Sequence, residues 1–476
     1  MNSTDEIDDL EKLRRQISEI TTQLISLVGE RMSVSHKIAM VKNERQLEVE
    51  DNNVEKMLRR AVLERCAETG VPDAFGLRIL NLLMAESIRL QKDEKPSNAP
   101  KQRVVKEHVE SHMKLFAVAK QMEENGERVI HLEIGEPDFP PPRPVVTGIS
   151  SALEAQHTHY TGSRGVLKLR EALANKFNQK SLKPISESNV IATPGGRFAI
   201  YLAMHALITQ GGEVIIPEPA WPAFKQSAEE VGGRPVIVKT RVEDGWRLSP
   251  NAIEDKITDT TEMIVLNSPN NPTGKVLEPE TTKAILKLAA DNEIPVLSDG
   301  VYADYAYVPF KGVEEIVDSG YIAIQSFSKS YAMTGFRVGY AVADEAIIAK
   351  MAKLQSLALT SIPEFIQYAA IDALNCHEDV ARNVEQVRQR IDISCAALEN
   401  LPLTFSKPEG GMYVFPRIDL KNFDSGEFAN RLLTQKKVAI APGHGFGDYP
   451  DYLRICLCQS EDVLLEGIEK IGELLR

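Results

Sequence analysis

The stretch Ser326-Phe-Ser-Lys-Ser-Tyr-Ala-Met-Thr-Gly-Phe-Arg337 decides the fold of this chain. It follows an apolar run at 322–324 that is typical of a buried strand, and it places Lys329 in a turn rich in hydroxyl groups. Burial disfavours the charged ammonium form, which makes a lysine usable as a nucleophile or proton carrier. The hydroxyls of Ser326 and Ser328 and the guanidinium of Arg337 would surround a phosphate. The stretch therefore predicts a phosphate site beside a reactive amine.

A lysine beside a phosphate site suggests pyridoxal phosphate. The motif by itself is also typical of a solvated loop lysine, so the surrounding chain has to decide. Strand-like runs alternate with helical stretches, at residues 190–192, 213–216, 235–239, 263–266, 294–297, 321–325 and 339–342. This alternation predicts a mostly parallel sheet with helices on both faces and ligands at the carboxyl ends of its strands.

Polar motifs follow the predicted strands where ligands would gather. The pair Gly195-Gly196 precedes a helical stretch, so backbone amides and a helix N-terminus face an anion. Asn271 closes one strand with an amide, and Asp299 and Tyr302 follow the next strand with a carboxylate and a phenol. With Lys329 and Arg337, these residues are expected on four consecutive strand ends. Other turns in this region contain Gly135, Tyr160 and Trp221.

Together these motifs resemble the fold-type I, class I/II pyridoxal-phosphate aminotransferases, over residues 104–476. The resemblance implies an α/β fold with a large, mostly parallel sheet domain and a smaller α+β domain. It implies that Lys329 forms the Schiff base with the cofactor and carries the proton between the substrate α carbon and the cofactor. Asp299 would keep the pyridine nitrogen protonated, and Arg454 would bind the substrate α-carboxylate.

The same resemblance assigns further contacts. The cofactor would be held by Gly195, Gly196, Arg197, Trp221, Asn271, Tyr302, Ser326, Ser328, Arg337 and the partner subunit's Tyr160. Gly135 would lie beside the substrate.

The first 95 residues follow a helical period instead. Nine apolar residues between 10 and 41 recur at steps of three, four or seven, which predicts one long amphipathic helix at about 6–43. Two shorter helices are predicted at about 50–68 and 74–92. Two short helices cannot cover the apolar stripe of the long one, so we expect an intertwined helical homodimer. Arg31 interrupts the stripe, which is costly unless it meets an anion.

A polar set shares this helical frame, namely Arg14, Arg31, Lys42, Asp51, Glu55, Ser87 and Gln91. A coiled coil with salt-bridged faces would also show charged residues at such positions. The spacing resembles that of the all-helical chorismate mutases over residues 7–92, without a gap. That resemblance implies a rearrangement of chorismate to prephenate, which requires a folded dicarboxylate and a stabilised ether oxygen rather than a nucleophile.

The mutase resemblance assigns each polar residue a contact with chorismate. Arg31 and the partner subunit's Arg14 would hold its two carboxylates, Lys42 and Gln91 would face the ether oxygen, Asp51 and Glu55 would bind the ring hydroxyl, and Ser87 would lie beside the substrate. The family often has an arginine where this chain has Val54, so we expect weakened activity. A domain without chemistry, kept for dimerisation or regulation, is the alternative.

Composition narrows the classes of partner. The 476 residues are 43% hydrophobic and 26% charged, and the net charge of −13 disfavours nucleic-acid and anionic-membrane partners. The chain has no apolar run near the roughly 20 residues that span a bilayer and no secretory-type apolar segment at its start. Five scattered cysteines show no metal-ligand spacing, so we expect a reduced, cytoplasmic protein without a metal.

We therefore expect a chorismate mutase-like helical domain at 1–95, a polar linker with prolines at 96–103, and an aminotransferase domain at 104–476. A chain that makes prephenate and carries an aminotransferase is expected to convert prephenate to arogenate, with glutamate or aspartate as donor. A site for such dicarboxylates needs a second cation, and Arg197 is the candidate. Alternatively, Arg197 would only support the helix whose N-terminus faces the phosphate. Amination of phenylpyruvate or 4-hydroxyphenylpyruvate is the alternative reaction.

Two other classes share parts of this pattern. Some transcription regulators join a helical DNA-binding module to an aminotransferase-like domain, but the acidic charge and the long first helix argue against that class. A β-eliminating pyridoxal-phosphate lyase on the same fold stays open at this point.

Overall fold

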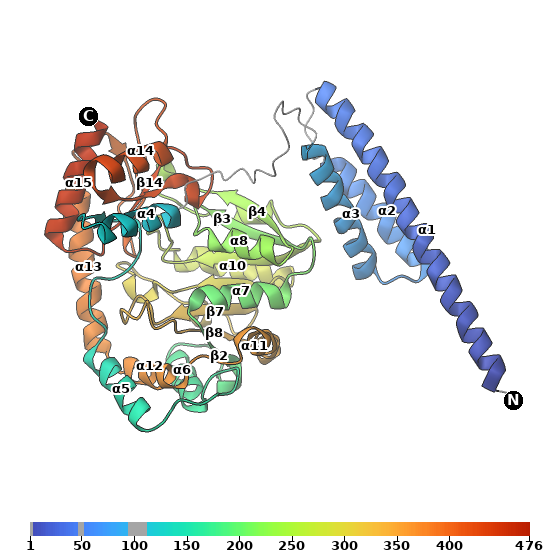
Figure 1. Ribbon diagram of the computed structural model, residues 1–476, viewed down its shortest axis with the longest axis horizontal. Helices are drawn as coiled ribbons and strands as arrows, with labels where there is room; N and C mark the ends of the chain where they lie inside the picture. The colour runs from blue at the N-terminus through green and yellow to red at the C-terminus, as the bar shows by residue number, and fades with distance from the viewer. Residues whose placement is uncertain (1–2, 46–51, 94–111) are drawn as a thin grey trace. The chain divides into compact units, whose positions relative to one another are not determined.

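The computed structural model describes residues 3–45, 52–93 and 112–476, so the expected linker at 96–103 lies outside the described residues. The chain divides into two compact units, one made mainly of the first 105 residues and the other of residues from 106 onward. The described part of the first unit is helical, and the second unit contains the strands (Figure 1). In the described ranges, no helix is long and apolar enough to cross a membrane.

The first unit consists of three helices, at the positions that the apolar period predicts. They are α1 (Ser3–Glu44), α2 (Asn52–Thr69) and α3 (Asp73–Asp93), and α3 contacts both of the others. Much of the apolar stripe of α1 is uncovered: Leu13, Ile17, Ile20, Leu24 and Leu27 are all more than half exposed. In this chain alone, the long helix does not bury the stripe that its sequence carries.

The second unit is built on a seven-stranded sheet that contains all seven predicted strands, in the order β2-β8-β7-β6-β5-β3-β4. The strands are β2 (Val190–Thr193), β3 (Glu213–Glu218), β4 (Arg234–Lys239), β5 (Thr261–Asn267), β6 (Val296–Asp299), β7 (Tyr321–Ser326) and β8 (Gly339–Ala343). Strand β8 is antiparallel to both of its neighbours, and the other pairs are parallel. This confirms the mostly parallel sheet.

The antiparallel strand changes one expectation. As predicted, Asn271 and Lys329 follow the carboxyl ends of β5 and β7, and Asp299 is the last residue of β6. Arg337 instead precedes β8, and it reaches the same edge of the sheet because β8 runs in the opposite direction. The expected four strand ends are therefore three carboxyl ends and one amino end.

Helices cover both faces of the sheet because its strands are apolar on both sides. Neighbouring residues point to opposite faces, so Ile215 packs into one hydrophobic cluster and Ile216 into another. The first cluster is covered by α5 (Arg143–Glu154), α6 (Leu167–Asn178), α9 (Pro250–Glu254), α10 (Pro279–Asp291) and α12 (Glu364–Ala373). The second is covered by α7 (Gly196–Leu207), α8 (Ala223–Glu230) and α11 (Glu345–Leu359).

A smaller α+β part of this unit has a separate hydrophobic cluster. Its helices are α4 (His112–Glu124), α13 (His377–Leu398), α14 (Ser425–Arg431) and α15 (Glu461–Leu475). Its strands form three small sheets: β1 (Ile130–His131) with β12 (Val438–Ala439), β9 (Leu403–Thr404) with β11 (Arg417–Ile418), and β14 (Leu453–Cys456) between β10 (Tyr413–Val414) and β13 (Ala441–Pro442).

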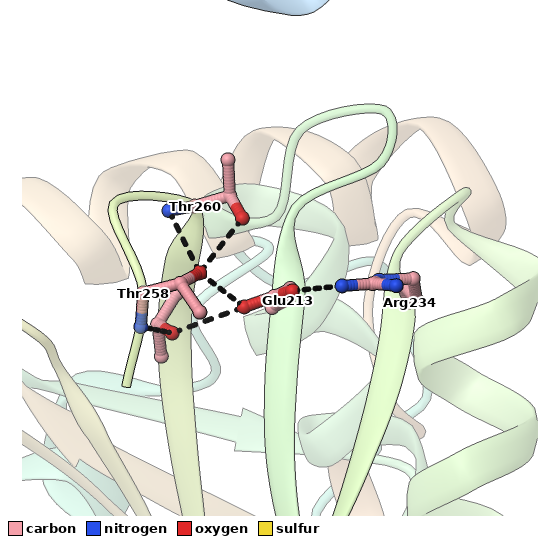
Figure 2. Close-up of polar contacts among 5 residues, drawn as sticks. Glu213, Arg234, Thr258 and Thr260 are labelled. Carbon is pink, nitrogen blue, oxygen red and sulfur yellow. Dashed lines mark hydrogen bonds and ion pairs between the residues drawn. The ribbon is translucent and has the colours of Figure 1, made fainter. Parts of the chain in front are cut away.

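A buried carboxylate at the amino end of β3 shows how this fold pairs a charge that it buries. Glu213 accepts hydrogen bonds from Arg234 and from the hydroxyls of Thr258 and Thr261 (Figure 2). Both of its oxygens are therefore paired, as a buried charge requires. The carboxylate at the opposite edge of the sheet, Asp299, lies in a different environment.

Candidate active site

A cavity of about 260 Å³ opens at the carboxyl edge of the large sheet, between it and the small α+β part. Twelve residues predicted for the site line it: Gly135, Gly196, Arg197, Trp221, Asn271, Asp299, Tyr302, Ser326, Ser328, Lys329, Arg337 and Arg454. They come from segments far apart in the sequence, and the parallel strands bring them together because their carboxyl ends share one edge.

Lys329 lies in the turn after β7, with its amine inside the cavity. Burial lowers the pKa of this amine below its ordinary value. The Nζ atom donates a hydrogen bond to the Gly135 carbonyl, and the Tyr305 hydroxyl donates one to the Lys329 carbonyl at 3.1 Å. The lysine is thus held in place and has more of the neutral, nucleophilic form than an exposed lysine.

Asp299 lies at the end of β6 and is almost completely buried. Burial raises the pKa of its carboxyl to about 7, although a backbone hydrogen bond from Val301 and the charge of Lys329 both act to lower it. Among the described residues, Asp299 forms no ion pair, in contrast to Glu213. A buried carboxylate without a cationic partner fits a ligand that carries a positive charge there, such as a protonated pyridine nitrogen.

An anion cradle lies beside Lys329. Gly195 has φ +82° and precedes helix α7, so the helix N-terminus faces the cavity. A Cβ at Gly339 would come within 2.6 Å of the Gly196 nitrogen, so glycine is required for this close approach. Ser326 donates to Ser328 at 2.9 Å, and Arg337 is held by the Thr334 carbonyl at 2.8 Å. Amides, hydroxyls and a guanidinium suit a phosphate, so the cradle and Asp299 together fit pyridoxal phosphate.

Arg454 lies on β14 and is buried, which is rare for arginine. It donates to Asn271 Oδ1 at 3.0 Å and to the Glu133 carbonyl. Its guanidinium lies over the rings of Tyr413 and Phe446, at 4.5 and 4.8 Å from their centroids. Its Nε atom is buried without a hydrogen-bond partner among the described residues. The side chain is therefore rigidly held and has donor capacity left for a carboxylate.

Arg197 follows the glycine pair on α7 and lines the same cavity. Its guanidinium lies over the Trp221 ring, 4.6 Å from the centroid. Burial and the nearby charge of Arg337 lower the pKa of the guanidinium. Within the described part of the chain, Arg197 forms no ion pair, and with Arg454 it is a second cation among the residues that line the cavity.

Tyr160 does not line the cavity of its own chain and is 89% exposed. Its loop is anchored to the start of α12, because the backbone nitrogens of His159 and Thr161 donate to Glu364 and Ser361. The role of this residue toward a partner subunit stays a prediction.

Tyr413 also lines the cavity, from β10, and was not among the predicted site residues. The hydroxyls of Tyr302 and Tyr413 are 2.8 Å apart. Glu136 and Thr334 also line the cavity and are joined by a hydrogen bond. No motif marks Tyr413; the alternation of Tyr413 and Phe415 indicates a buried strand and not a site.

In the helical unit, the structure brings together two of the predicted mutase residues. Arg31 donates to the Ser87 hydroxyl and to the Leu83 carbonyl, and Ser35 donates to Ser87 at 2.9 Å. Burial lowers the pKa of the Arg31 guanidinium. At its seam position, the guanidinium of Arg31 is therefore hydrogen-bonded to neutral oxygens of α3.

The other predicted mutase residues are not brought together by the described side chains. Arg14 is exposed and Lys42 is half-buried, both on α1. Asp51 lies outside the described residues, as do the side chains of Glu55 on α2 and Gln91 on α3.

Comparison with known families decides the identity of both units. Residues 127–471 match the family model of class I and II aminotransferases, and residues 13–92 match that of type II chorismate mutases. The chain belongs to the class I and II aminotransferases and carries a chorismate mutase domain. It is accordingly an isomerase and a pyridoxal-phosphate-dependent transferase.

Several relatives share the aminotransferase part. An aspartate aminotransferase of Pyrococcus horikoshii is 36% identical over 76% of this chain and 93% of its own length. A probable aspartate/prephenate aminotransferase of Aquifex aeolicus is 33% identical over 77% and 97%. The structure of an aspartate aminotransferase from Thermus thermophilus with maleate superposes with a TM-score of 0.74, at 30% identity, over 80% of this chain and all of that one. The fold of the aminotransferase unit is thus shared with this solved structure.

Proposed function

We propose that this aminotransferase converts chorismate to prephenate in its helical domain and then transaminates prephenate to arogenate, with glutamate or aspartate as donor. The observation that carries the proposal is the pair of guanidinium groups, Arg454 and Arg197, that lines one cavity with Lys329. Prephenate, glutamate and aspartate each carry two carboxylates. Two fixed cations in one cavity suit such substrates better than they suit an acceptor with a single carboxylate.

Two comparisons support this substrate class. The Thermus thermophilus relative binds maleate, which is a dicarboxylate, and the Aquifex aeolicus relative is described as acting on aspartate and prephenate. The match of residues 13–92 to the type II chorismate mutases also supports it, because that reaction would supply prephenate within the same polypeptide. We infer that the ring carboxylate of prephenate and the side-chain carboxylate of the donor use the same cation, Arg197.

The residues of the cavity have distinct tasks in this proposal. When bound, pyridoxal phosphate supplies an electron sink for the bond that breaks at the substrate α carbon. Asp299 holds the ring nitrogen in its protonated form, and Lys329 moves the proton at the α carbon. Arg454 orients the substrate through its α-carboxylate, and its backbone and ring contacts keep it from moving with the ligand.

In the helical domain, Arg31 and the partner subunit's Arg14 hold the two carboxylates of chorismate, while Lys42 and Gln91 stabilise charge on the ether oxygen. Asp51 and Glu55 bind the ring hydroxyl. Ser87 positions Arg31, to which it is hydrogen-bonded. This domain needs no cofactor, because the reaction is a rearrangement within one molecule.

The decisive experiment supplies the purified chain with chorismate, glutamate and pyridoxal phosphate at mildly alkaline pH. Products are followed by mass spectrometry before any acid treatment, because acid converts prephenate to phenylpyruvate and arogenate to phenylalanine. Arogenate is the expected product. Accumulation of prephenate, together with amination of added phenylpyruvate or 4-hydroxyphenylpyruvate, would show that the acceptor is wrong.

The variant Arg197→Leu tests the cation directly. We expect the KM for prephenate to rise about tenfold or more, because a charge-assisted contact with a carboxylate is lost. The matched control is Arg388→Leu, since Arg388 is an exposed arginine on α13 that pairs with Glu385. Unchanged KM for prephenate in Arg197→Leu would overturn the role of this residue.

A further inference from the structure

Tyr413 contacts one residue expected at the cofactor and one expected at the substrate, and it belongs to no sequence motif. It is 2% exposed, lies on β10 and contributes to the lining of the cavity. Its hydroxyl is 2.8 Å from that of Tyr302, and its ring lies under the guanidinium of Arg454. These two neighbours face different parts of the ligand, since Tyr302 is expected at the cofactor and Arg454 at the substrate carboxylate.

The hydroxyls of Tyr302 and Tyr413 share one hydrogen bond, and either oxygen can be its donor. Burial raises the pKa of both phenols, so each keeps its single proton at neutral pH. One proton occupies the line between the two oxygens. Neither hydroxyl has another hydrogen-bond partner among the described residues, and Tyr302 has the cavity beside it. When Tyr413 donates to Tyr302, the Tyr302 proton is directed at a ligand oxygen, and accepting that bond makes Tyr302 a stronger donor.

The space for the Tyr413 hydroxyl exists because residue 135 is glycine. A Cβ at Gly135 would lie 1.6 Å from the Tyr413 oxygen. The same glycine offers its carbonyl to the Lys329 amine. Glycine is therefore required at position 135 on steric grounds, apart from any contact of this residue with the substrate.

The ring of Tyr413 supports Arg454. The guanidinium carbon lies 4.5 Å from the ring centroid, and Phe446 lies 4.8 Å from the same group. The Tyr302 ring meets the Tyr413 ring edge-on, with centroids 5.7 Å apart. Such contacts hold a desolvated arginine in one orientation, because they replace the water that it loses on burial.

We propose that Tyr413 is a positioning residue that directs the Tyr302 hydroxyl proton at the cofactor and holds the Arg454 guanidinium for the substrate carboxylate. This role rests on the proposed tasks of Tyr302 and Arg454, and it does not depend on which keto acid is the acceptor. The hydrogen bond on which this role depends joins Tyr302 and Tyr413, which are 111 positions apart in the chain.

The test is a spectrophotometric pH titration of the bound cofactor in the full-length holoenzyme, without substrate. In Tyr413→Phe, the Tyr302 hydroxyl donates more weakly to the cofactor's phenolic oxygen. The less stabilised oxygen raises the apparent pKa of the bound chromophore, by about half a unit. The KM for the amino donor that the wild-type enzyme uses, aspartate or glutamate, stays within about twofold, because the ring remains. In Tyr413→Leu, the titration shifts in the same way and this KM rises about tenfold.

Two comparisons separate this role from simple packing. Tyr307→Phe is the matched control, since it removes a hydroxyl that donates to Gly411, two residues before Tyr413, and that does not line the cavity. Its titration is expected to match the wild type. In a Tyr302→Phe background, Tyr413→Phe is expected to cause no further shift, because its effect passes through Tyr302.

An unchanged titration in Tyr413→Phe, or a shift that persists without the Tyr302 hydroxyl, would overturn the proton-directing role. A KM in Tyr413→Leu within about twofold of the wild type would overturn the support of Arg454. Failure of prephenate as an acceptor would leave these titrations as they are, so the two proposals fail independently.

Discussion

The two units of this chain bury their apolar residues in different ways. The aminotransferase unit has separate hydrophobic clusters on both faces of its sheet and in its small α+β part, all made by one chain. The mutase unit leaves much of the apolar stripe of α1 exposed, with Leu24 and Leu27 more than half accessible. A stripe of that length is stable in water when a second copy covers it. The difference teaches that one chain completes the interior of one unit and that the other unit is expected to need a partner.

The arginines proposed to bind substrate in the two units also differ in how much of the chain holds them. Arg454 is buried between two aromatic rings and bonded to two other segments of the chain. Arg31 is half-buried and bonded to oxygens of a single neighbouring helix. If the two sites are chemically independent, substitutions in one leave the other reaction unchanged. The following predictions test this independence.

The largest effect is expected for Lys329→Ala. Transamination should fall by at least about a thousandfold, because the amine that binds the cofactor and moves the proton is lost. Chorismate mutase activity should stay within about twofold, as measured by chorismate consumption. Lys287→Ala is the control, since Lys287 is an exposed lysine that pairs with Asp291. A large loss of mutase activity would show that the two reactions are coupled.

The reciprocal change is Arg31→Ala. We expect chorismate consumption to fall by about a hundredfold or more, because one charged contact with a carboxylate is removed. Amination of an aromatic keto acid should be unchanged. Arg60→Ala removes an exposed arginine of α2, paired with Glu64, and should affect neither reaction. Retained mutase activity in Arg31→Ala would place the carboxylate site elsewhere on the helices.

Asp299 should make the stability of the cofactor-free protein depend on pH. Its folded-state pKa is about 7, against an ordinary value of 3.8, so between these pH values the folded state holds a proton that the unfolded state has lost. The free energy of unfolding therefore falls as pH rises through this window, by up to about 4 kcal/mol. In Asp299→Asn, this part of the fall is absent.

Thermal unfolding of the cofactor-free protein at pH 5 and pH 8 measures this difference. The control is Asp318→Asn, which changes an exposed carboxylate. An equal loss of stability in the wild type and in Asp299→Asn would show that Asp299 is ionised in the empty cavity. With the cofactor bound, the wild type should be more stable than Asp299→Asn, because the pyridine nitrogen of the cofactor pairs with the wild-type carboxylate.

The smallest effect is expected for Val54→Arg. Val54 is about half exposed on α2, at the position where the resemblance to the mutases leads us to expect an arginine. Adding the cation should raise the rate of chorismate consumption about threefold to tenfold. Met57→Arg adds the same charge one turn later on the same helix, at an exposed position, and should leave the rate unchanged. Equal rates in all three proteins would mean that position 54 lies outside the site.

Much of this molecule follows from local sequence. The period of three and four residues predicts α1, and each of the seven predicted apolar runs overlaps one strand of the large sheet. Residues directly after those runs, such as Asn271, Asp299 and Lys329, are predictable site residues because parallel strands end at one edge. The direction of β8 cannot be predicted from the sequence, because an apolar run does not show which strands it will pair with.

The sequence by itself determined which residue types stand at the strand ends and along the three helices, and through the two family resemblances it indicated the cofactor and the two reaction classes. Only the tertiary structure decided the contacts that tune those residues. Tyr413 meets Tyr302 across 111 positions, and Arg454 bonds the Glu133 carbonyl across 321. Burial raises the pKa of Asp299, and the extent of that burial depends on every element packed around the carboxyl. Such effects arise from distant segments that share no local pattern, so they exist only once the chain is folded.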